Sequence, residues 1–159
     1  MPEPEIMAIA VNRKIHGYSY VEKVKRGWEA VVKRIAEITE KSQSMGYVVL
    51  DTCSRQEIYI AAPEDRIYSY AREIGEAMAR ASSADPRIYG GLELVEHMLR
   101  VLSGSESPAP FEKDILDQIR RALNRAPQTG YGAKILYNIF REAAELSIGI
   151  RRDLGIMVV

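Results

Sequence analysis

Two short apolar segments, residues 45–51 and 57–62, lie next to each other in the chain with the polar stretch Thr52-Cys53-Ser54-Arg55 between them. Each segment has the length and composition of a β-strand. Two strands this close in sequence should pair as a hairpin or a bent ribbon. This pairing limits the possible folds more than any other feature of the sequence, and it places the single cysteine of the chain in the turn.

The flanking segments extend this hairpin into a larger pattern. Residues 5–11 form an apolar run that predicts a largely buried first strand, and apolar residues three and four positions apart predict an amphipathic helix over 21–41. Pro63-Glu64-Asp65 opens a second helix that Asp85-Pro86 ends, and residues 87–89 predict a short fourth strand. The order β-α-β-β-α-β predicts an α+β protein with a ferredoxin-like antiparallel sheet and two helices on one face.

Three more helices are predicted after this pattern, over residues 92–103, 113–126 and 131–152. We therefore divide the chain into a ferredoxin-like core with the cysteine motif (1–90) and a C-terminal three-helix extension (91–159). A length of 159 residues fits one compact domain overall. The apolar run at 156–159 has no closing turn, which is typical of the cut edge of a longer protein.

Composition excludes several classes of function. The 22 Lys and Arg balance 22 Asp and Glu, so the chain lacks the basic excess of a general nucleic-acid binder. One Cys and two His exclude an intramolecular disulfide and a Cys/His zinc site, and no metal is expected. No apolar run is long enough to span a membrane, so we expect a cytoplasmic protein without membrane contact. The predicted C-terminal helices carry six arginines, which form either a phosphate-binding face or an ordinary solvated helix surface: Arg120, Arg121, Arg125, Arg141, Arg151 and Arg152.

Cys53 is the first candidate for chemistry, because it lies where an apolar strand gives way to a polar turn. Arg55 follows two residues later, and in extended backbone both side chains would point to the same side. A guanidinium there would favour the thiolate or hold a substrate carboxylate. The alternative is that Cys53 is a small buried hydrophobic residue.

His97 is the second candidate. On the predicted helix over 92–103, the apolar stripe contains Leu92, Val95, Met98, Leu99 and Leu102. His97 lies at the edge of this stripe, so its imidazole is expected to be half-buried. Such an imidazole serves either as a general acid or base, or only as a packed or helix-capping residue. The third feature is the Ser-rich turn before residue 113, in which Ser107 and Glu112 flank a helix start and are ordinarily explained as caps.

In combination, these motifs resemble the N-terminal catalytic domain of glutamyl-tRNA reductases. Residues 50–59, Leu-Asp-Thr-Cys-Ser-Arg-Gln-Glu-Ile-Tyr, are similar to that family's Leu-Ser-Thr-Cys-Asn-Arg-x-Glu-Ile-Tyr signature. The run from Glu96 to Gly104 resembles its His-Leu-Phe-Arg-Val-x-Ser-Gly segment. The likeness continues through Ser107, Glu112, Ile115, Gln118, Leu136, Phe140, Ala143 and Arg151.

This resemblance implies that the Cys53 thiolate attacks the ester of glutamyl-tRNA, releases the tRNA and keeps a glutamyl thioester. In that family a hydride from NADPH then reduces the thioester to glutamate-1-semialdehyde for tetrapyrrole and haem synthesis. The resemblance makes His97 the second catalytic residue and pairs Arg55 with the substrate carboxylate. The implied glutamate-binding residues are Thr52, Ser54, Arg55, Ser107, Glu112, Lys113, Asp114 and Gln118.

Some features depart from the family pattern. Ser54 replaces an Asn, and Phe111 replaces a Gly behind Pro108 and Pro110, so the turn that shapes the pocket must differ. The family's NADPH-binding Rossmann domain and dimerisation helices are not in this sequence. We therefore expect no NADPH site in the chain, a monomer, and only thioester formation or esterase activity from the domain alone. Besides glutamyl-tRNA, the expected partners are the missing NADPH-binding domain and the next enzyme of the pathway.

Two alternatives stay open. One is a degenerate relative that lost the chemistry and acts as a tRNA-binding or protein-binding regulatory module. The other is a ferredoxin-like domain of unrelated function in which Cys53 is buried.

Overall fold

The computed structural model describes residues 4–41, 45–104, 114–126 and 131–155. The elements follow one another as β1 (Pro4–Asn12), α1 (Arg13–His16), α2 (Tyr18–Arg26), α3 (Trp28–Lys41), β2 (Gly46–Asp51), β3 (Arg55–Pro63), α4 (Glu64–Ser82), β4 (Arg87–Gly90), α5 (Gly91–Ser103), α6 (Asp114–Arg125) and α7 (Tyr131–Asp153). No helix in the described part of the chain is long and apolar enough to cross a membrane.

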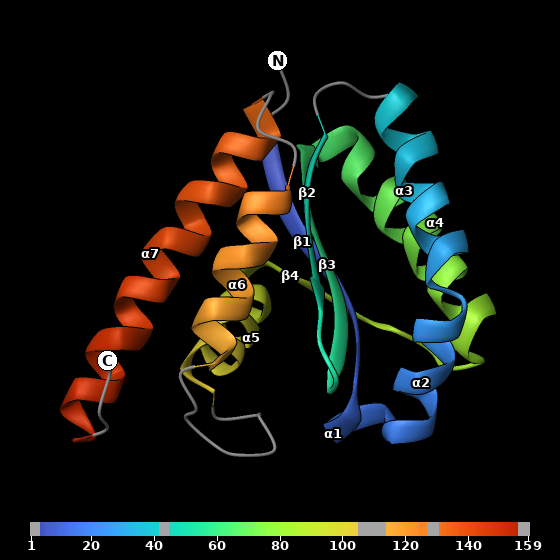
Figure 1. The fold of residues 1–159 in the computed structure, drawn as a ribbon. Coiled ribbons are helices and arrows are strands. Elements are labelled where there is room, and N and C mark those ends of the chain that lie inside the picture. The colour runs from blue at the N-terminus through green and yellow to red at the C-terminus, as the bar shows by residue number, and fades with distance from the viewer. Residues whose placement is uncertain (1–3, 42–44, 105–113, 127–130, 156–159) are drawn as a thin grey trace.

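The strands form one sheet in the order β2-β3-β1-β4, and every neighbouring pair is antiparallel. This is the order of a ferredoxin-like sheet, so the predicted α+β fold class is confirmed. Figure 1 shows three layers, with α2, α3 and α4 on one side of the sheet and α5, α6 and α7 on the other. Both faces of the sheet are therefore covered by helices.

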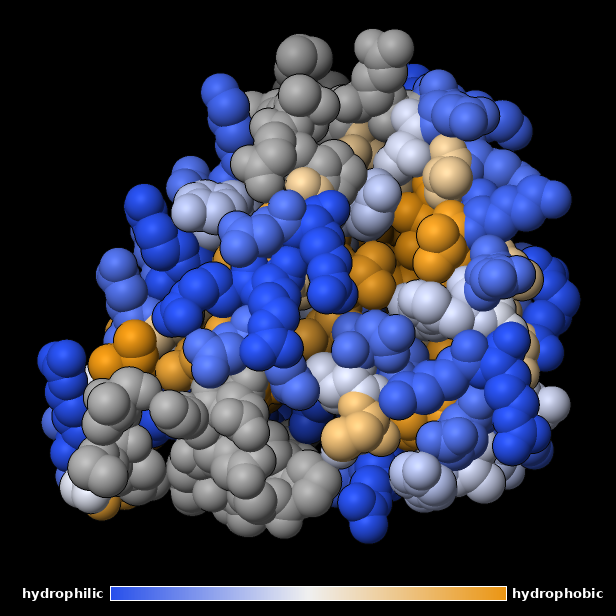
Figure 2. Space-filling model, in the orientation of Figure 1, coloured by the Kyte–Doolittle hydropathy of each residue, from blue (hydrophilic) through white to orange (hydrophobic). Residues whose placement is uncertain are grey.

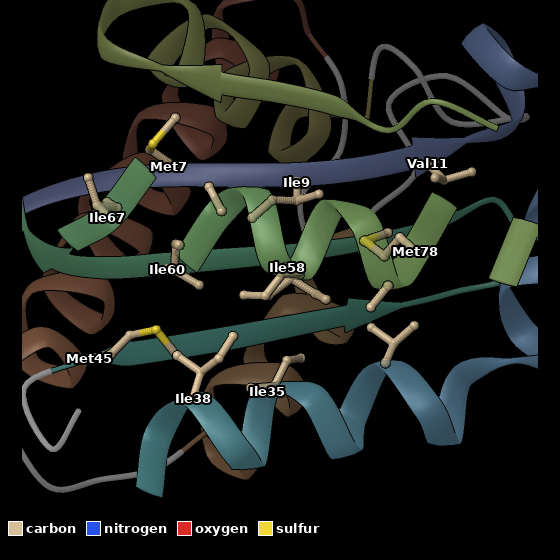
Figure 3. Close-up of a cluster of buried hydrophobic side chains, with 14 of the residues drawn as sticks. Met7, Ile9, Val11, Ile35, Ile38, Met45, Ile58, Ile60, Ile67 and Met78 are labelled. Carbon is tan, nitrogen blue, oxygen red and sulfur yellow. The ribbon is translucent and has the colours of Figure 1, made fainter. Parts of the chain in front are cut away.

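Alternation along the strands divides the apolar residues between the two faces. Ile9 on β1 and Ile58 and Ile60 on β3 point toward the layer of α2, α3 and α4, where they pack with Ile35 and Met78 (Figure 3). All five side chains are buried. Because the two central strands contribute to both faces, their sequences read as nearly continuous apolar runs, which is why residues 5–11 predict a buried strand.

The opposite face of the sheet forms a second core with the C-terminal helices. Tyr59 and Leu50 pack there against Met98 of α5, Ile119 of α6 and Phe140 of α7. Figure 2 shows hydrophobic residues gathered between the two helical layers, while the outer surfaces of the helices are predominantly hydrophilic. The predicted helical extension thus shares a core with the sheet.

The single helix expected over 21–41 is wrong, because Gly27 separates α2 from α3. A Cβ atom at Gly27 would lie 2.7 Å from the Cβ of Ala81 on α4. Close approach to α4 at this position therefore excludes any side chain. The apolar periodicity continues across the break, so it carries no sign of the interruption.

Two smaller expectations also change. β3 starts at Arg55 rather than Glu57, which leaves Thr52–Ser54 as the connection from β2. Arg55 is therefore a strand residue, paired with Asn12 of β1. In addition, the short helix α1 follows β1 directly, with the Asn12 side chain accepting a 2.8 Å hydrogen bond from the Ile15 N–H as its N-cap.

We expect Gly27→Ala to lower the free energy of unfolding by about 1–3 kcal/mol, because the new methyl group overpacks the contact with Ala81. Gly149→Ala on α7 is the matched control, since a Cβ there meets nothing within 4 Å. That variant should gain about 0.5–1 kcal/mol from helix propensity. Urea unfolding of both variants measures this, and equal effects would contradict the packing argument.

Candidate functional site

The connection between β2 and β3 presents Cys53 at the surface. The backbone N–H of Thr52 donates to the carbonyl of Arg55 at 2.9 Å, and the N–H of Ser54 donates to the Thr52 hydroxyl oxygen at 3.2 Å. Thr52 and Ser54 are buried, whereas Cys53 is exposed, with its Sγ 3.7 Å from the Ser54 hydroxyl oxygen. The sulfur is therefore accessible on a tight turn, which contradicts the alternative of a buried cysteine.

Side chains and backbone from neighbouring elements hold this turn in place. The buried side-chain amide of Gln56 donates to the Asp51 carboxylate at 2.8 Å and to the Thr52 carbonyl at 2.9 Å. The N–H of Arg13, at the start of α1, donates to the Ser54 carbonyl at 2.8 Å. These bonds tie both ends of the turn to the sheet and to α1, so Cys53 lies on rigid backbone.

A buried polar network begins two residues after Cys53. Arg55, Glu57 and Tyr59 alternate along β3 and therefore share the face that packs on the C-terminal helices. The Glu57 carboxylate has no exposed surface and accepts from Arg55 Nη1 at 3.4 Å, from the Tyr59 hydroxyl at 2.5 Å and from His97 Nε2 at 3.0 Å. A buried carboxylate is tolerated only when it is paired in this way.

Electrostatics keep Glu57 ionised. Burial alone would raise its pKa, but the hydrogen bond and charge of His97, the charge of Arg55 and the Tyr59 hydroxyl together lower the pKa of Glu57 below its ordinary value. The same environment, burial first and then the Glu57 charge, raises the pKa of Tyr59 well above its ordinary value, so its hydroxyl stays a donor. Because a carboxylate only accepts, His97 carries a proton on Nε2.

His97 is fully buried, at 1% exposure, and not half-buried as expected. Its ring stacks on Tyr89 of β4, with ring centroids 4.0 Å apart and planes 10° apart. Ala8 of β1 lies between Tyr59 and Tyr89 in the sheet register, so a small residue separates the two rings next to the imidazole. The imidazole therefore has both its orientation and its proton fixed.

The buried face of α5 also differs from the expected stripe. Leu92 is 83% exposed and Val95 51% exposed, while Leu94 and Val101 are buried beside His97. The hydrogen bonds to Glu57 draw the imidazole into the interior and set this face of the helix inward. Met98 and Leu102 of the expected stripe are buried as predicted, so the prediction fails only at Leu92 and Val95.

The structure describes only some of the remaining predicted site residues. Ser107, Glu112 and Lys113 lie outside the described residues. Asp114 is the first residue of α6, and Gln118 is half-buried one turn further along. Since α6 contacts β2 and α5, Gln118 belongs to the same side of the sheet as the polar network.

Two further residues, His16 and Arg151, have a structural function. His16 Nδ1 accepts from the Asn12 N–H at 3.2 Å, and its Nε2 donates to the Asp85 carbonyl at 2.7 Å, which fastens α1 to the loop before β4. Arg151 is fully buried on α7, and burial lowers its pKa, so it does not belong to an exposed phosphate-binding face. The expected basic face of the C-terminal helices is wrong at that position.

Sequence reasoning missed Glu57, Gln56 and Tyr89 as site residues. For Glu57 a signal exists, because an acid at an alternate position of an otherwise apolar strand must find buried partners. For Tyr89 no such signal exists, since only the sheet register brings it to His97.

Comparisons with known proteins converge on one family. The family model described as "Glutamyl-tRNAGlu reductase, N-terminal domain" matches residues 9–154. The glutamyl-tRNA reductase of Archaeoglobus fulgidus is 29% identical over 141 residues, and that of Methanosarcina mazei is 31% identical over 144 residues; each match covers 89% of this chain and 31% of the relative. The solved structure of the Methanopyrus kandleri glutamyl-tRNA reductase aligns with a TM-score of 0.70 at 28% identity, covering 93% of this chain and 34% of that one. The chain thus spans about a third of the length of the relatives it matches.

The exposed position of Cys53 predicts prompt alkylation in the native state. Iodoacetamide should modify the folded protein at a rate of the same order as the unfolded protein. The matched control combines Cys53→Ser with Ser54→Cys, which moves the thiol to the neighbouring buried position. Its folded-state rate should be at least about tenfold lower, and equal rates for the two proteins would contradict the described turn.

Glu57→Gln should destabilise the fold by about 3–5 kcal/mol, because it removes the buried charge that pairs with both Arg55 and His97. The double variant Arg55→Met with Glu57→Leu replaces the pair with apolar residues. Its loss of unfolding free energy should be clearly smaller than the sum of the losses of Arg55→Met and Glu57→Leu measured singly. Urea unfolding measures both, and additive losses would show that the two charges do not interact.

The same carboxylate predicts a pH dependence. Since the pKa of Glu57 is lower in the folded state, its ionisation stabilises the fold above about pH 4.3, and this contribution is lost as the pH falls through the folded-state pKa. Below about pH 4.3, wild-type stability should therefore fall more steeply than that of Glu57→Gln. Parallel curves for the two proteins would contradict this assignment.

Proposed function

Because this chain belongs to the glutamyl-tRNA reductase family and corresponds to its N-terminal domain, we propose that Cys53 accepts the glutamyl group of glutamyl-tRNA as a thioester. The Cys53 thiolate would attack the ester carbonyl carbon, forming a C–S bond and breaking the bond to the oxygen of the terminal ribose. That oxygen leaves with the tRNA and takes a proton from water at the exposed site. The family role is in tetrapyrrole synthesis.

The observation that carries this proposal is the exposed thiol on a fixed turn directly beside a buried charged network. A thiolate is a strong nucleophile toward esters and a good leaving group afterwards, which suits a residue that must accept and then release an acyl group. Rigid attachment of the turn through Gln56 and Arg13 would keep the sulfur in one position as the substrate binds.

Arg55 is proposed to hold the side-chain carboxylate of the glutamyl group. A planar guanidinium suits bidentate pairing with a carboxylate, and burial at 3% exposure would strengthen that pairing. Glu57 fixes one nitrogen of the guanidinium, so the orientation of Arg55 depends on Glu57. Thr52, Ser54, Asp114 and Gln118 stay predicted pocket residues, together with Ser107, Glu112 and Lys113.

His97 is proposed to act through this network. Its Nε2–H is directed at the Glu57 carboxylate, and its ring is clamped by Tyr89. Geometry therefore favours a positioning residue that keeps Glu57 ionised and thereby keeps Arg55 oriented. This differs from direct proton transfer to the substrate, which the resemblance alone left open.

The described residues do not fit a nicotinamide cofactor. A dinucleotide-binding unit needs adjacent parallel strands with a glycine-rich turn at a helix N-terminus, whereas each strand of the described sheet is antiparallel to its neighbours. We propose that hydride reduction by NADPH depends on the part of a full-length reductase outside the third that this chain matches. With this chain alone, water would hydrolyse the thioester slowly and release glutamate.

Incubation with glutamyl-tRNA carrying radioactive glutamate tests the proposal. Wild-type protein should retain label after acid precipitation, and neutral hydroxylamine should release it, as expected for a thioester. Cys53→Ala should retain none, and Arg55→Lys should be labelled about tenfold or more slowly, because a lysine cannot reproduce the bidentate contact.

Equal labelling of wild type and Cys53→Ala would overturn the proposal. If neither protein is labelled, and wild type and Cys53→Ala bind tRNA with the same affinity, the domain would instead be a tRNA-binding module that has lost the chemistry.

A further inference from the structure

The surface beside Cys53 on the side of α1 and α2 has no assigned function. Figure 1 shows α1 next to the end of the β2–β3 hairpin, and the Arg13 N–H bonds directly to the Ser54 carbonyl at 2.8 Å. Arg13 and Lys14 are exposed there, and Tyr18, at the start of α2, is 55% exposed. An aromatic ring and two cations thus lie next to the turn that carries the nucleophile.

Tyr18 and Arg13 form a pair of fixed geometry. The guanidinium carbon of Arg13 lies 5.9 Å from the centroid of the Tyr18 ring. The Tyr18 hydroxyl hydrogen-bonds to Glu22, and this bond, with the charges of Glu22 and of Cys53, raises the pKa of Tyr18. His16 anchors α1 to the loop before β4. The exposed ring is therefore held in place near the thiol.

The position of Arg55 tells which part of a substrate would reach this ring. Arg55 lies on the face of β3 that packs against the C-terminal helices, whereas α2 belongs to the opposite layer and α1 leads to it from the end of the sheet. In an aminoacyl ester, the amino-acid side chain and the terminal ribose lie on opposite sides of the carbonyl carbon. With the carbonyl at Cys53 and the glutamyl side chain toward Arg55, the ribose and its base extend toward α1 and α2.

Building on the proposed function, we propose that Tyr18 and Arg13 form a platform for the terminal adenosine of glutamyl-tRNA. The adenine stacks on the exposed Tyr18 ring, and Arg13 contacts the phosphate of the terminal nucleotide. An exposed aromatic ring with a neighbouring guanidinium is the combination with which proteins bind single-stranded nucleic acid. Further basic residues for the backbone of the acceptor strand are supplied along α2 by Lys23, Lys25 and Arg26.

The platform complements the overall charge of the chain. Because Lys and Arg only balance Asp and Glu, a polyanion must be bound by a local patch. The α1–α2 surface provides such a patch next to the proposed reacting sulfur, because Arg13 and Lys14 are exposed beside the turn. Specificity for an RNA-linked glutamate would then come from the side of the ester opposite Arg55.

Rates of glutamyl transfer to Cys53 test the platform when two donors are compared: glutamyl-tRNA, and glutamate α-ethyl ester, which has no nucleoside. Tyr18→Ala should slow transfer from glutamyl-tRNA about tenfold, equivalent to about 1.4 kcal/mol, and leave transfer from the ethyl ester unchanged. Tyr18→Phe keeps the stacking surface and should retain most of the rate. Tyr68→Ala on α4 removes another exposed tyrosine, 64% exposed, and is the matched control.

A second variant tests the phosphate contact. Arg13→Gln should reduce the slope of the logarithm of the tRNA binding constant against the logarithm of salt concentration by about one, which corresponds to the loss of one phosphate contact. An equal slowing of both donors by Tyr18→Ala would overturn the platform, because the residue would then support only the turn. So would a Tyr18→Ala protein with wild-type rates on both donors.

Failure of the proposed function is distinguishable from failure of the platform. If wild-type protein forms no thioester with either donor, binding of uncharged tRNA to Cys53→Ala, measured by fluorescence anisotropy, still decides between the outcomes. The double variant Cys53→Ala with Tyr18→Ala should bind intact uncharged tRNA about tenfold more weakly than Cys53→Ala alone. The two proteins should bind a tRNA that lacks the terminal adenosine equally well. Equal affinity of the two proteins for the intact tRNA would overturn the platform.

Discussion

The carboxylate of Glu57 lies inside the molecule with no exposed surface, and its neighbours are arranged around its charge. Removing such a charge from water costs several kcal/mol, so the folded state requires Arg55, His97 and Tyr59 to pair with it together. These partners come from β3 and α5, and Tyr89 of β4 holds the imidazole against them. One buried charge therefore couples the sheet to the C-terminal helical layer, and the candidate site forms only when both are in place.

This coupling explains why the two faces of the sheet differ. The face toward α2, α3 and α4 contains an aliphatic core, and from this face Gln56 anchors the turn that carries Cys53. The opposite face carries the polar network within a second core, between Tyr59, Met98 and Phe140. Surrounding apolar side chains exclude water from the network, and a dry environment strengthens each of its charged hydrogen bonds. Stability and preorganisation of the site thus depend on the same packing.

Features that depend on local pattern could be predicted from the sequence, whereas features set by distant contacts could not. Alternating and continuous apolar runs predicted the strands and their order, and the motif around Cys53 predicted an accessible thiol. The break at Gly27 escaped prediction because it reflects the approach of Ala81, which lies far away in the sequence. The burial of His97 escaped for a similar reason, since a helix stripe shows hydrophobicity but not the carboxylate that lies opposite it. Arg55 was assigned to the turn because the polar run extends one residue into β3.

The placement of Cys53 at the end of the sheet has a consequence for the fate of an acyl group bound there. Arg55 faces the C-terminal helices, and the α1–α2 surface lies on the other side of the turn, so in the proposed complex the glutamyl side chain and the terminal adenosine lie on either side of the sulfur. The third direction, outward from the turn, is open in the described part of this chain, because Cys53 is exposed. A thioester there would be accessible to water. If Cys53 carries the proposed thioester, its exposure means that protection from water before reduction must come from outside the described residues.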